Sequence, residues 1–333
     1  MFRHLTACLI GLSFLVSATT AFAATPEVEF KFALVNNLDN LYGFSTQVFA
    51  KRMEELSGGS MKVHIFHSGQ LGSGEREMIE GLQLGTVDIC TVASSPVTSY
   101  QKEFLIFNFP YLFRNLETYY KVVDGSIGAD LGNLLEKHDM KLVGWWNLGL
   151  FGFTNSKRPV HAAADAKGLK IRTQENPMII AFWKHLGAVP TPMAFGELFT
   201  ALQQGTVDGQ ETAVADWAAN RYFETQKYGT VTGHYIMAAP VLASKAKYDS
   251  LTPEQRAVFD QAMREAVLAQ RTEYDRLLKL SIDTLRQNGM DIDTEPDNAS
   301  FAEATRPMYE DFKRQLPPVV SGWVDTIQAM HAR

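Results

Sequence analysis

Apolar positions along the chain change repeatedly between a strand-like and a helix-like spacing. Residues 30–35 and 61–66 are short runs rich in aromatic and β-branched side chains, which is typical of strands. Between them, residues 44–56 carry apolar side chains three and four positions apart, the spacing of a helix that buries one face. The alternation continues along the chain and favours an α/β fold with doubly wound, mainly parallel sheets. Further strands are expected at 87–93, 141–146, 151–155, 169–173 and 235–244, and further helices at 75–84, 131–137, 179–186, 196–204 and 253–287.

A seven-residue segment recurs 120 positions later in the chain. Residues 82–88 read LQLGTVD and residues 202–208 read LQQGTVD, so six of the seven are identical. In both copies an apolar helical run ends at a glycine, which adopts the left-handed conformation without steric cost. Each copy follows an expected strand, 61–66 for the first and 168–172 for the second. The repeat predicts two similar lobes with a ligand-binding cleft between them.

The longest helical pattern, residues 253–287, is expected to connect the two lobes. Thr252 is suited to cap its start, and Pro253 suits its first turn. At ~1.5 Å per residue the helix would be about 50 Å long, more than one lobe needs. We expect a division into lobe I, residues 24–148 plus about 238–277, and lobe II, residues 149–237 plus about 278–333.

The first 23 residues have the three-part pattern of a secretory signal peptide. Arg3 gives a basic start, residues 5–16 are mostly apolar, and Ala21-Phe22-Ala23 is a small-x-small cleavage site. The apolar run is shorter than the ~20 residues that a membrane span needs. We predict cleavage after Ala23 and a periplasmic location.

Composition and motifs argue against nucleic-acid binding and catalysis. The formal charge of −6 becomes −7 when Arg3 is removed with the leader, which disfavours a nucleic-acid partner. Cys90 is then left without an internal disulfide partner. The chain has no Gly-x-Ser-x-Gly, phosphate loop, Cys-x-x-Cys or His-x-x-x-His motif, so we expect no enzyme activity, no cofactor and no metal. The remaining histidines are scattered and are expected at the surface or at strand ends: His64, His67, His138, His161, His185, His234 and His331.

Arg172 is the one charged residue expected inside a buried strand. It follows Ile171 at the end of the run 168–172, where a permanent charge needs a partner. Two interpretations stay open: a salt bridge within the lobe, or a bidentate clamp on a ligand carboxylate. Ligands of open α/β sheets bind beyond the carboxyl ends of strands, which is where Arg172 is expected.

Several motifs together resemble the solute receptors of TRAP (tripartite ATP-independent periplasmic) transporters, the DctP-like class. They are Gly69-Gln70-Leu71-Gly72 followed by Glu75-Arg76-Glu77, then Gly85-Thr86-Val87-Asp88, Phe109-Pro110-Tyr111-Leu112-Phe113, Gly168-Leu169-Lys170-Ile171-Arg172, and Pro190 to Leu198 running into Ala201 to Glu211. The resemblance implies a two-lobed periplasmic binding protein fold with a hinge-spanning long helix. It also implies capture of a small organic acid by lobe closure and delivery to the membrane subunits of a permease.

Position by position, the resemblance implies a set of ligand-binding residues. Arg172 matches the arginine that clamps the ligand carboxylate, Phe195 a pocket aromatic, and Glu211 the acid that closes the Asp-Gly-Gln-Glu motif. The full expected set is Asn36, Glu75, Ser94, Asn147, Phe151, Arg172, Glu175, Phe195, Glu211, Thr212 and Trp217.

Two departures from the family pattern bear on the ligand. Phe151 stands where the family often has a second arginine, and Thr212 stands where it often has an asparagine. A second ligand carboxylate would lack a cationic partner, and burying it unpaired is costly. A monocarboxylate such as a sugar acid is therefore favoured. Trp145, Trp146 and Trp217 are candidate stacking faces, with core packing expected for at least one of them. A C4-dicarboxylate receptor and, more remotely, an ATP-driven uptake receptor are the alternatives, and we expect a monomer.

Overall fold

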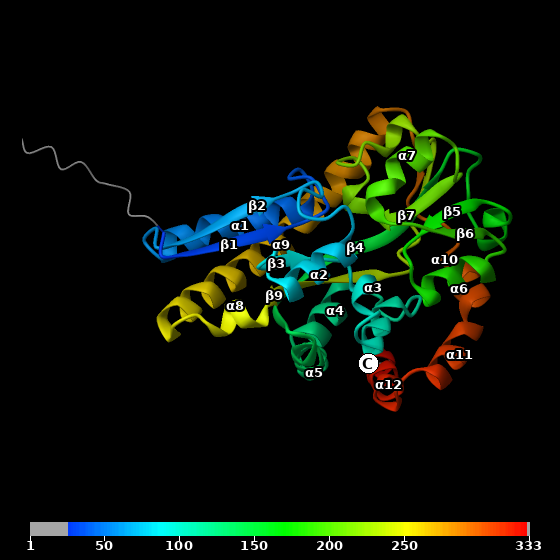
Figure 1. Cartoon of the computed structure of the whole chain (residues 1–333). Coiled ribbons are helices and arrows are strands. Elements are labelled where there is room, and N and C mark those ends of the chain that lie inside the picture. The colour runs from blue at the N-terminus through cyan, green and yellow to red at the C-terminus, as the bar shows by residue number, and fades with distance from the viewer. Residues whose placement is uncertain (1–25, 332–333) are drawn as a thin grey trace, which may run out of the picture.

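Two groups of strands are joined by a pair of long strands that run from one half of the molecule into the other (Figure 1). The computed structural model describes residues 26–331, and the predicted signal peptide lies outside the described residues. The strands are β1 Val28–Ala33, β2 Met61–Phe66, β3 Ile89–Thr91, β4 Met140–Asn155, β5 Lys170–Thr173, β6 Val189–Pro192, β7 Gly209–Ala213, β8 Tyr228–Thr230, β9 Ile236–Ser244 and β10 Asp291–Asp293. Their hydrogen-bonded order is β2-β1-β3-β9-β4-β7-β5-β6, with β8 beside β4 and β10 beside β8.

Helices cover both halves of this sheet (Figure 1). The longer ones are α1 Leu41–Leu56, α2 Glu75–Leu84, α4 Leu116–Val123, α5 Ser126–Leu135, α6 Pro177–His185, α7 Leu198–Gln203, α9 Pro253–Gln287, α10 Asn298–Thr305, α11 Pro307–Gln315 and α12 Pro318–Met330. Short turns of helix are α3 Ser94–Val97, α8 Lys245–Asp249, and the 3₁₀ segments η1 Lys102–Asn108, η2 Glu136–His138, η3 Ala163–Ala166, η4 Phe195–Glu197, η5 Val214–Asp216 and η6 Tyr222–Glu224. We call the half built on β1, β2 and β3 the first lobe, and the half built on β5, β6 and β7 the second lobe.

The core of each lobe has the parallel strands that the sequence predicts, but the strands that connect the lobes make the whole sheet mixed. Within each lobe the three core strands are parallel, β1 with β2 and β3, and β5 with β6 and β7. The two crossing strands β4 and β9 are antiparallel to each other and to their neighbours β7 and β3. The reason is geometric: β4 leaves the first lobe and β9 returns to it, so the two must run in opposite directions.

β4 is one strand of 16 residues, although two strands, 141–146 and 151–155, were expected. Its first part pairs with β9, and from Phe151 onward it pairs with β7. The pairing shifts between Asn147 and Gly149, and Gly149 has φ of +77°. This local irregularity interrupts the strand-like pattern in the sequence without ending the strand.

The repeated segment occupies the same structural position in both lobes. Its first copy is the end of α2 and the connection to β3, and its second copy is the end of α7 and the connection to β7. The strand before the second copy is β6, not the segment 168–172 that the sequence suggested, because β6 is the counterpart of β2. The segment 168–172 instead contributes to β5, which is the counterpart of β1 and lies between β6 and β7.

α9 has the bounds that its pattern predicts and passes from one hydrophobic core to another. Gln255 N–H donates to Thr252 Oγ1 at 3.2 Å, and Thr252 N–H donates to Gln255 Oε1 at 3.1 Å, which caps the helix start. Phe259 and Met263 are buried in the core that covers the first lobe, whereas Leu285 is buried in a core of the second lobe. The helix therefore spans both lobes.

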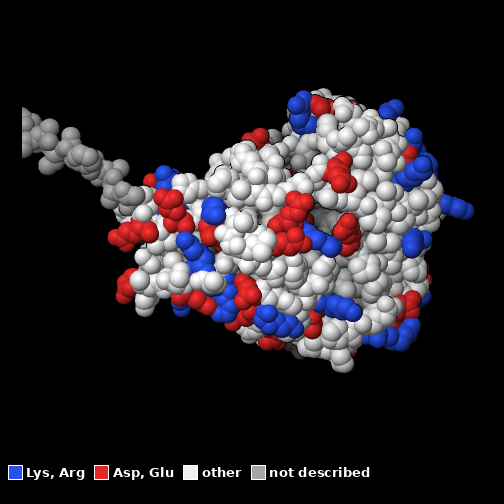
Figure 2. Space-filling model, in the orientation of Figure 1, with Lys and Arg blue, Asp and Glu red and all other residues white. Residues whose placement is uncertain are grey.

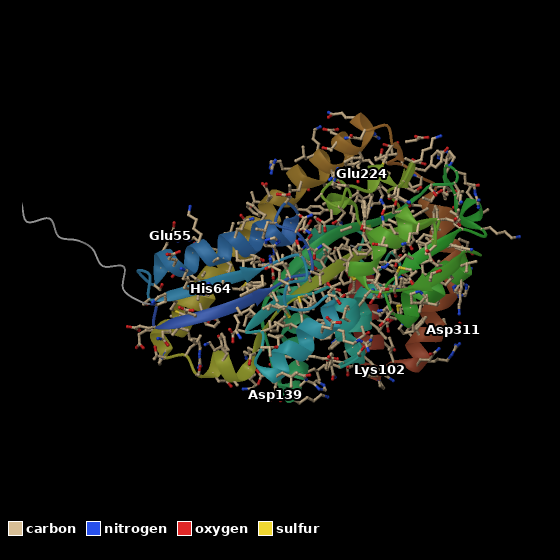
Figure 3. All side chains as sticks on the ribbon, turned by 45° about the horizontal axis from the view of Figure 1, so that its top comes forward. Glu55, His64, Lys102, Asp139, Glu224 and Asp311 are labelled. Carbon is tan, nitrogen blue, oxygen red and sulfur yellow. The ribbon has the colours of Figure 1, made fainter. Side chains whose placement is uncertain are left out.

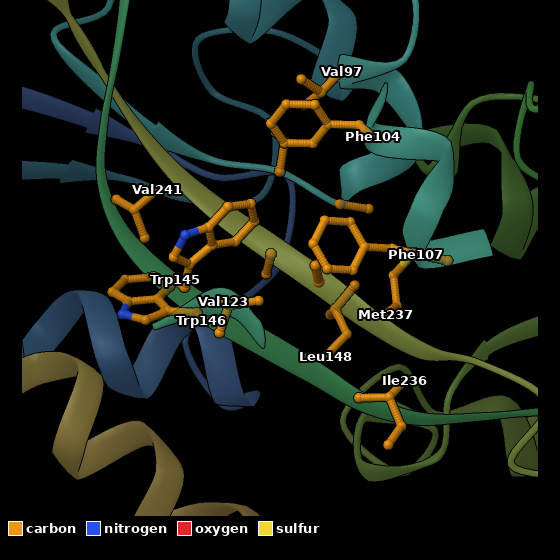
Figure 4. Close-up of a cluster of buried hydrophobic side chains, with 14 of the residues drawn as sticks. Val97, Phe104, Phe107, Val123, Trp145, Trp146, Leu148, Ile236, Met237 and Val241 are labelled. Carbon is orange, nitrogen blue, oxygen red and sulfur yellow. The ribbon is translucent and has the colours of Figure 1, made fainter. Parts of the chain in front are cut away.

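The crossing strands carry an aromatic cluster that holds the first lobe together (Figure 4). Trp145 and Trp146 are adjacent in β4 and so point to opposite faces of the sheet. Trp145 lies 5.5 Å from Phe107 between ring centres, and Trp146 stacks on Phe32 at 5.9 Å. Both tryptophans are therefore core residues.

Candidate functional site

A cavity lies between the lobes, beyond the carboxyl ends of β1, β3, β5 and β7. Its volume is about 40 Å³, and a neighbouring cavity of about 80 Å³ shares four of its wall residues. Each exceeds the roughly 10–15 Å³ that one water molecule needs, so together they accommodate several small groups. The wall of the first cavity consists of Val35, Asn36, Tyr42, Glu75, Ala93, Leu148, Phe151, Arg172, Gln174, Phe195, Thr212, Ala213, Asp216 and Asn220.

Arg172 is the cation of this cavity. Charged side chains such as Glu55, Lys102 and Asp311 lie at the outside of the molecule (Figure 3), whereas Arg172 is only 2% exposed. Its Nε and Nη2 donate to the carbonyl oxygen of Met193 at 3.1 and 2.9 Å. Within residues 26–331, Nη1 has no hydrogen-bond partner.

The structural salt bridge that the sequence left open for Arg172 does not form. No carboxylate of the described residues lies within 4.0 Å of its guanidinium nitrogens. Burial lowers the pKa of Arg172, while the negative charge of Glu211 and Glu75 acts to raise it. The ring of Phe195 lies 6.0 Å from the guanidinium carbon. The site thus holds a buried cation with a free donor and no ion pair to a carboxylate of the described residues.

Glu75 is a partly buried acid of the first lobe. It is the first residue of α2, and its Oε1 accepts a hydrogen bond from the N–H of Ala93 at 2.7 Å. Burial raises the pKa of Glu75 to about 7, although this hydrogen bond and Arg172 act to lower it. Near neutral pH the carboxyl group is therefore close to the midpoint of its titration.

Asp216 is a second cavity acid, and the sequence analysis missed it. It ends η5, is 4% exposed, and its Oδ1 has no partner among the described residues. Burial raises the pKa of Asp216 to about 7, whereas a hydrogen bond from the N–H of Leu41 lowers it. An aspartate within the otherwise apolar run from Ala213 to Trp217 was the signal that could have identified it. Tyr42, Gln174 and Asn220 were missed as well.

Seven of the eleven expected residues lie in the walls of the two cavities. They are Asn36, Glu75, Phe151, Arg172, Phe195 and Thr212 in the first cavity, and Glu175 in the second. Ser94, Asn147, Glu211 and Trp217 lie in neither wall.

Ser94 and Asn147 point away from the cavity. Ser94 Oγ lies 3.1 Å from the sulfur of Met237 and is fully buried. Asn147 Nδ2 donates to Gln270 Oε1 and to the hydroxyl of Tyr120, each at 3.0 Å, and so ties β4 to α9 and α4. Asn147 is thus a contact of the crossing region.

Glu211 lies behind the cavity, in a buried polar cluster. Its Oε2 accepts from Trp183 Nε1 at 2.7 Å and lies 3.2 Å from Nε2 of His234. His234 is fully buried and stacks on Phe182, with ring centres 4.6 Å apart, which corrects the expectation that the histidines lie at the surface or at strand ends. Packing by the Phe182 ring and the carboxylate of Glu211 explains how an imidazole is accommodated there.

Trp217 is a core residue of the second lobe. It is fully buried, and a Cβ added at Gly152 or Gly229 would lie 2.9 Å from its ring. Its indole N–H donates to the carbonyl of Thr212 at 3.4 Å. The close approach of two glycines leaves no face of the ring for stacking on a ligand.

The lobes touch each other around the cavity. Arg76 Nη2 of the first lobe lies 3.2 Å from Glu175 Oε2 of the second, and Asn37 Nδ2 donates to the carbonyl of Ala219 at 3.1 Å. A Cβ added at Gly196 would lie 2.7 Å from the carbonyl oxygen of Ser73. Figure 2 shows a hollow in this face, bordered by acidic and basic side chains. The lobes are therefore closed on the cavity.

Two α/β lobes that close on a buried cation define the class of two-lobed solute-binding proteins, and comparisons with known proteins identify the family. The model of the bacterial extracellular solute-binding proteins, family 7, matches residues 32–315. The 2,3-diketo-L-gulonate-binding periplasmic protein of Escherichia coli K12 is 34% identical over 271 residues, 81% of this chain and 82% of that protein.

Solved structures agree with this assignment. A TRAP periplasmic solute-binding protein from Polaromonas sp. JS666, bound to D-erythronate, is 37% identical with a TM-score of 0.86, covering 91% of this chain and 99% of that one. A TRAP periplasmic solute-binding protein from Sulfurospirillum deleyianum with bound succinate is 27% identical with a TM-score of 0.84, covering 92% and 99%. The chain belongs to family 7 of the bacterial extracellular solute-binding proteins, the family of TRAP solute receptors.

Among residues 26–331, no helix combines the length and apolar character needed to cross a membrane.

Proposed function

We propose that this solute receptor captures an organic acid with a single carboxylate, held by Arg172, in the periplasm. The observation that carries the proposal is a buried guanidinium that forms no ion pair with a carboxylate of the described residues and keeps Nη1 without a partner. Burying an unpaired charge is costly, so such a group is maintained where a ligand supplies the counter-charge. A carboxylate placed at the free Nη1 would form a charge-assisted hydrogen bond in a site sheltered from water.

The other polar groups of the wall favour a ligand with hydroxyl groups, such as a sugar acid. Asn36, Gln174 and Thr212 offer amide and hydroxyl groups, and the cavity acids are acceptors when ionised. Relatives that bind D-erythronate or 2,3-diketo-L-gulonate support this class of ligand. Phe151 supplies an apolar face where a second arginine would have paired a second carboxylate.

A C4-dicarboxylate receptor is the alternative, because a relative of the same family holds succinate. It is less favoured, since Arg172 is the only Lys or Arg among the wall residues of the first cavity. Delivery to TRAP permease subunits, export through the N-terminal leader and a monomeric state belong to the same proposal.

The contacts of the crossing region support the expected lobe boundary near residue 148. Gln270 of α9 is fully buried and bonds to Asn147 of β4. Tyr274 of the same helix accepts a hydrogen bond from the N–H of Leu150 at 2.9 Å. We place the hinge here, where both crossing elements are fastened to one another.

Removing the clamp tests the proposal directly. The wild type is first screened by thermal shift against sugar acids, including erythronate, because a ligand at 100 times its Kd stabilises by about 2.7 kcal/mol. Arg172→Ala should then weaken the best ligand at least about 100-fold in calorimetry, and Arg172→Lys should restore little of it. Arg276→Ala is the control, because Arg276 is exposed and pairs only along α9 with Glu273. Retained tight binding by folded Arg172→Ala would rule out the clamp.

A further inference from the structure

Asp216 is a cavity acid that the carboxylate clamp leaves without a role. It comes directly after β7, on the short η5 segment, and its side chain is almost fully buried. One carboxylate oxygen, Oδ1, has no hydrogen-bond partner in the described part of the chain. A buried acceptor left unsatisfied is costly, so its persistence at a cavity wall points to a ligand group that completes it.

The position of Asp216 is fixed from both lobes. The N–H of Leu41, at the start of α1 in the first lobe, is near enough to the Asp216 carboxylate to act to lower its pKa. Leu41 also packs with Ala215 and with Tyr274 of the hinge helix. Three residues after Asp216, the carbonyl of Ala219 accepts a hydrogen bond from Asn37 Nδ2 of the first lobe. Residues of both lobes thus surround Asp216 when the lobes are closed, and its Oδ1 has no partner within the described residues.

The groups around Asp216 offer it no counter-ion. Tyr42, Tyr222 and Tyr274 are the titratable side chains that feel its charge, and all three are neutral phenols at ordinary pH. Among the wall residues of this cavity, Arg172 is the one cation, and it has no ion pair with Asp216. The cavity therefore has a cationic group at Arg172 and a separate acid, Asp216, that forms no ion pair within the described residues.

We propose that Asp216 is a specificity-determining residue that accepts a hydrogen bond from a ligand hydroxyl and excludes ligands with a second carboxylate. The inference rests on the proposed function, because the ligand must be oriented by its carboxylate on Arg172. A hydroxyl can donate to Oδ1, whereas a carboxylate can only accept. Above about pH 7, where Asp216 is ionised, a second ligand carboxylate would place two like charges side by side in a site sheltered from water.

Matched pairs of acids test this inference. Erythronate and tartrate share four carbons and differ in one terminal group, a hydroxymethyl or a carboxylate; galactonate and galactarate are the six-carbon pair. Both acids of the pair whose monocarboxylate binds the wild type more tightly are titrated into the wild type and into Asp216→Asn. The calorimetry is done at pH 8, where Asp216 is ionised. We expect the wild type to prefer the monocarboxylate at least about 100-fold, and the preference to fall at least about tenfold in Asp216→Asn.

Two further variants serve as an alternative substitution and as a control. Asp216→Ser also removes the charge and replaces Asp216→Asn if that variant does not fold. Glu224→Gln, an exposed acid eight residues further along, is the control and should leave both affinities unchanged.

The outcomes separate the inference from the function on which it rests. If the wild type binds a monocarboxylate through Arg172 but the preference survives in Asp216→Asn, the inference fails and the proposed function stands. If the wild type binds the dicarboxylate of both pairs more tightly, or neither member of either pair, both fail.

Discussion

The two copies of the repeated segment have the same structure, yet they support lobes with different chemistry. In the first lobe, Asp88 Oδ2 accepts from the N–H of Lys31 in β1 at 2.8 Å. In the second, Asp208 Oδ2 accepts from the N–H of Lys170 in β5 at 2.9 Å. The aspartates also donate their own N–H to the carbonyls of the same two lysines. The repeat is therefore a structural clip that joins a helix end to the central strand of its lobe.

The residues that differ between the lobes are those at the cavity. The repeated aspartates bond to Lys31 of β1 and Lys170 of β5. Two residues further along each strand, Ala33 of β1 corresponds to Arg172 of β5. Glu75 of the first lobe lies ten residues before Gly85, and Phe195 of the second lies ten residues before Gly205, so these two positions correspond. A shared scaffold thus presents an acid from one lobe and a cation with an aromatic from the other. The guanidinium proposed to clamp the ligand carboxylate therefore comes from the second lobe.

The largest expected effect comes from removing the positive charge of Arg172, which its counterpart in the first lobe, Ala33, lacks. Arg172→Met should abolish binding but leave the unfolding free energy of the ligand-free protein within about 1 kcal/mol of the wild-type value. Removing the buried unpaired charge offsets the loss of the two hydrogen bonds to the Met193 carbonyl. Ala33→Met, at the fully buried counterpart, should instead lower the unfolding free energy by about 1–3 kcal/mol through overpacking. Denaturant unfolding measures both, and destabilisation by Arg172→Met beyond that range would contradict the assignment of Arg172 as a functional rather than a structural residue.

The contrast between Glu75 and Phe195 predicts a pH dependence of stability. The pKa of Glu75 is raised to about 7 in the folded protein, above about 4.3 in an unfolded chain. Between these values the folded state keeps a proton that the unfolded state has lost, so stability falls as pH rises. The loss is about 1.4 kcal/mol for each pKa unit of difference, and it is complete above the folded pKa.

Glu75→Gln isolates this effect from other titrating groups. The stability of the wild type relative to Glu75→Gln should decline from pH 4 to pH 8, when both are unfolded by denaturant at each pH. Phe195→Leu, at the corresponding position, should show no such slope against the wild type. A relative stability of Glu75→Gln that is independent of pH would show that the burial of Glu75 does not raise its pKa.

Removing either clip should cost about 1–3 kcal/mol, because each substitution leaves a backbone N–H without its acceptor. We expect Asp88→Ala and Asp208→Ala to lower the unfolding free energy by similar amounts and to leave ligand affinity within about threefold, since neither residue lines the cavity. Chemical denaturation and calorimetry on the same samples provide the test. A binding loss confined to Asp208→Ala would mean that the clip also positions Arg172 on β5.

Local signals in the sequence predicted the elements that depend on local interactions. The end of α2 at Gly85 and the start of α9 at Thr252 were predicted because a left-handed glycine and a capping box act over a few residues. β4 was expected as two strands because Gly149 interrupts its pattern. Only its pairing with β9 and β7, which are distant in sequence, makes it continuous.

The sequence likewise predicted some residues of the site and missed others. Arg172 and Phe195 belong to motifs that the sequence displays, and both lie in the cavity wall. Asn147 and Trp217 have residue types that suit a ligand site, but their side chains point to α9 and into the second core, which no local pattern encodes. Asp216 was missed for the opposite reason: its neighbours in sequence are apolar, and only the closed lobes bring it to Arg172 and Glu75.

The smallest expected effect tests whether the repeat glycines are equivalent. Gly85 and Gly205 have φ of +73° and +69°, and a Cβ added at either would meet no atom within 4 Å. The cost of Gly85→Ala or Gly205→Ala therefore comes from the left-handed backbone alone, about 1 kcal/mol in each lobe. Gly322→Ala in α12 is the matched control, because its Cβ is also uncrowded but its backbone is helical, and it should stabilise by about 0.5–1 kcal/mol. Denaturant midpoints at constant m-value give the three changes, and a difference of more than about 1 kcal/mol between the two repeat variants would show that the copies differ in structure as well as in chemistry.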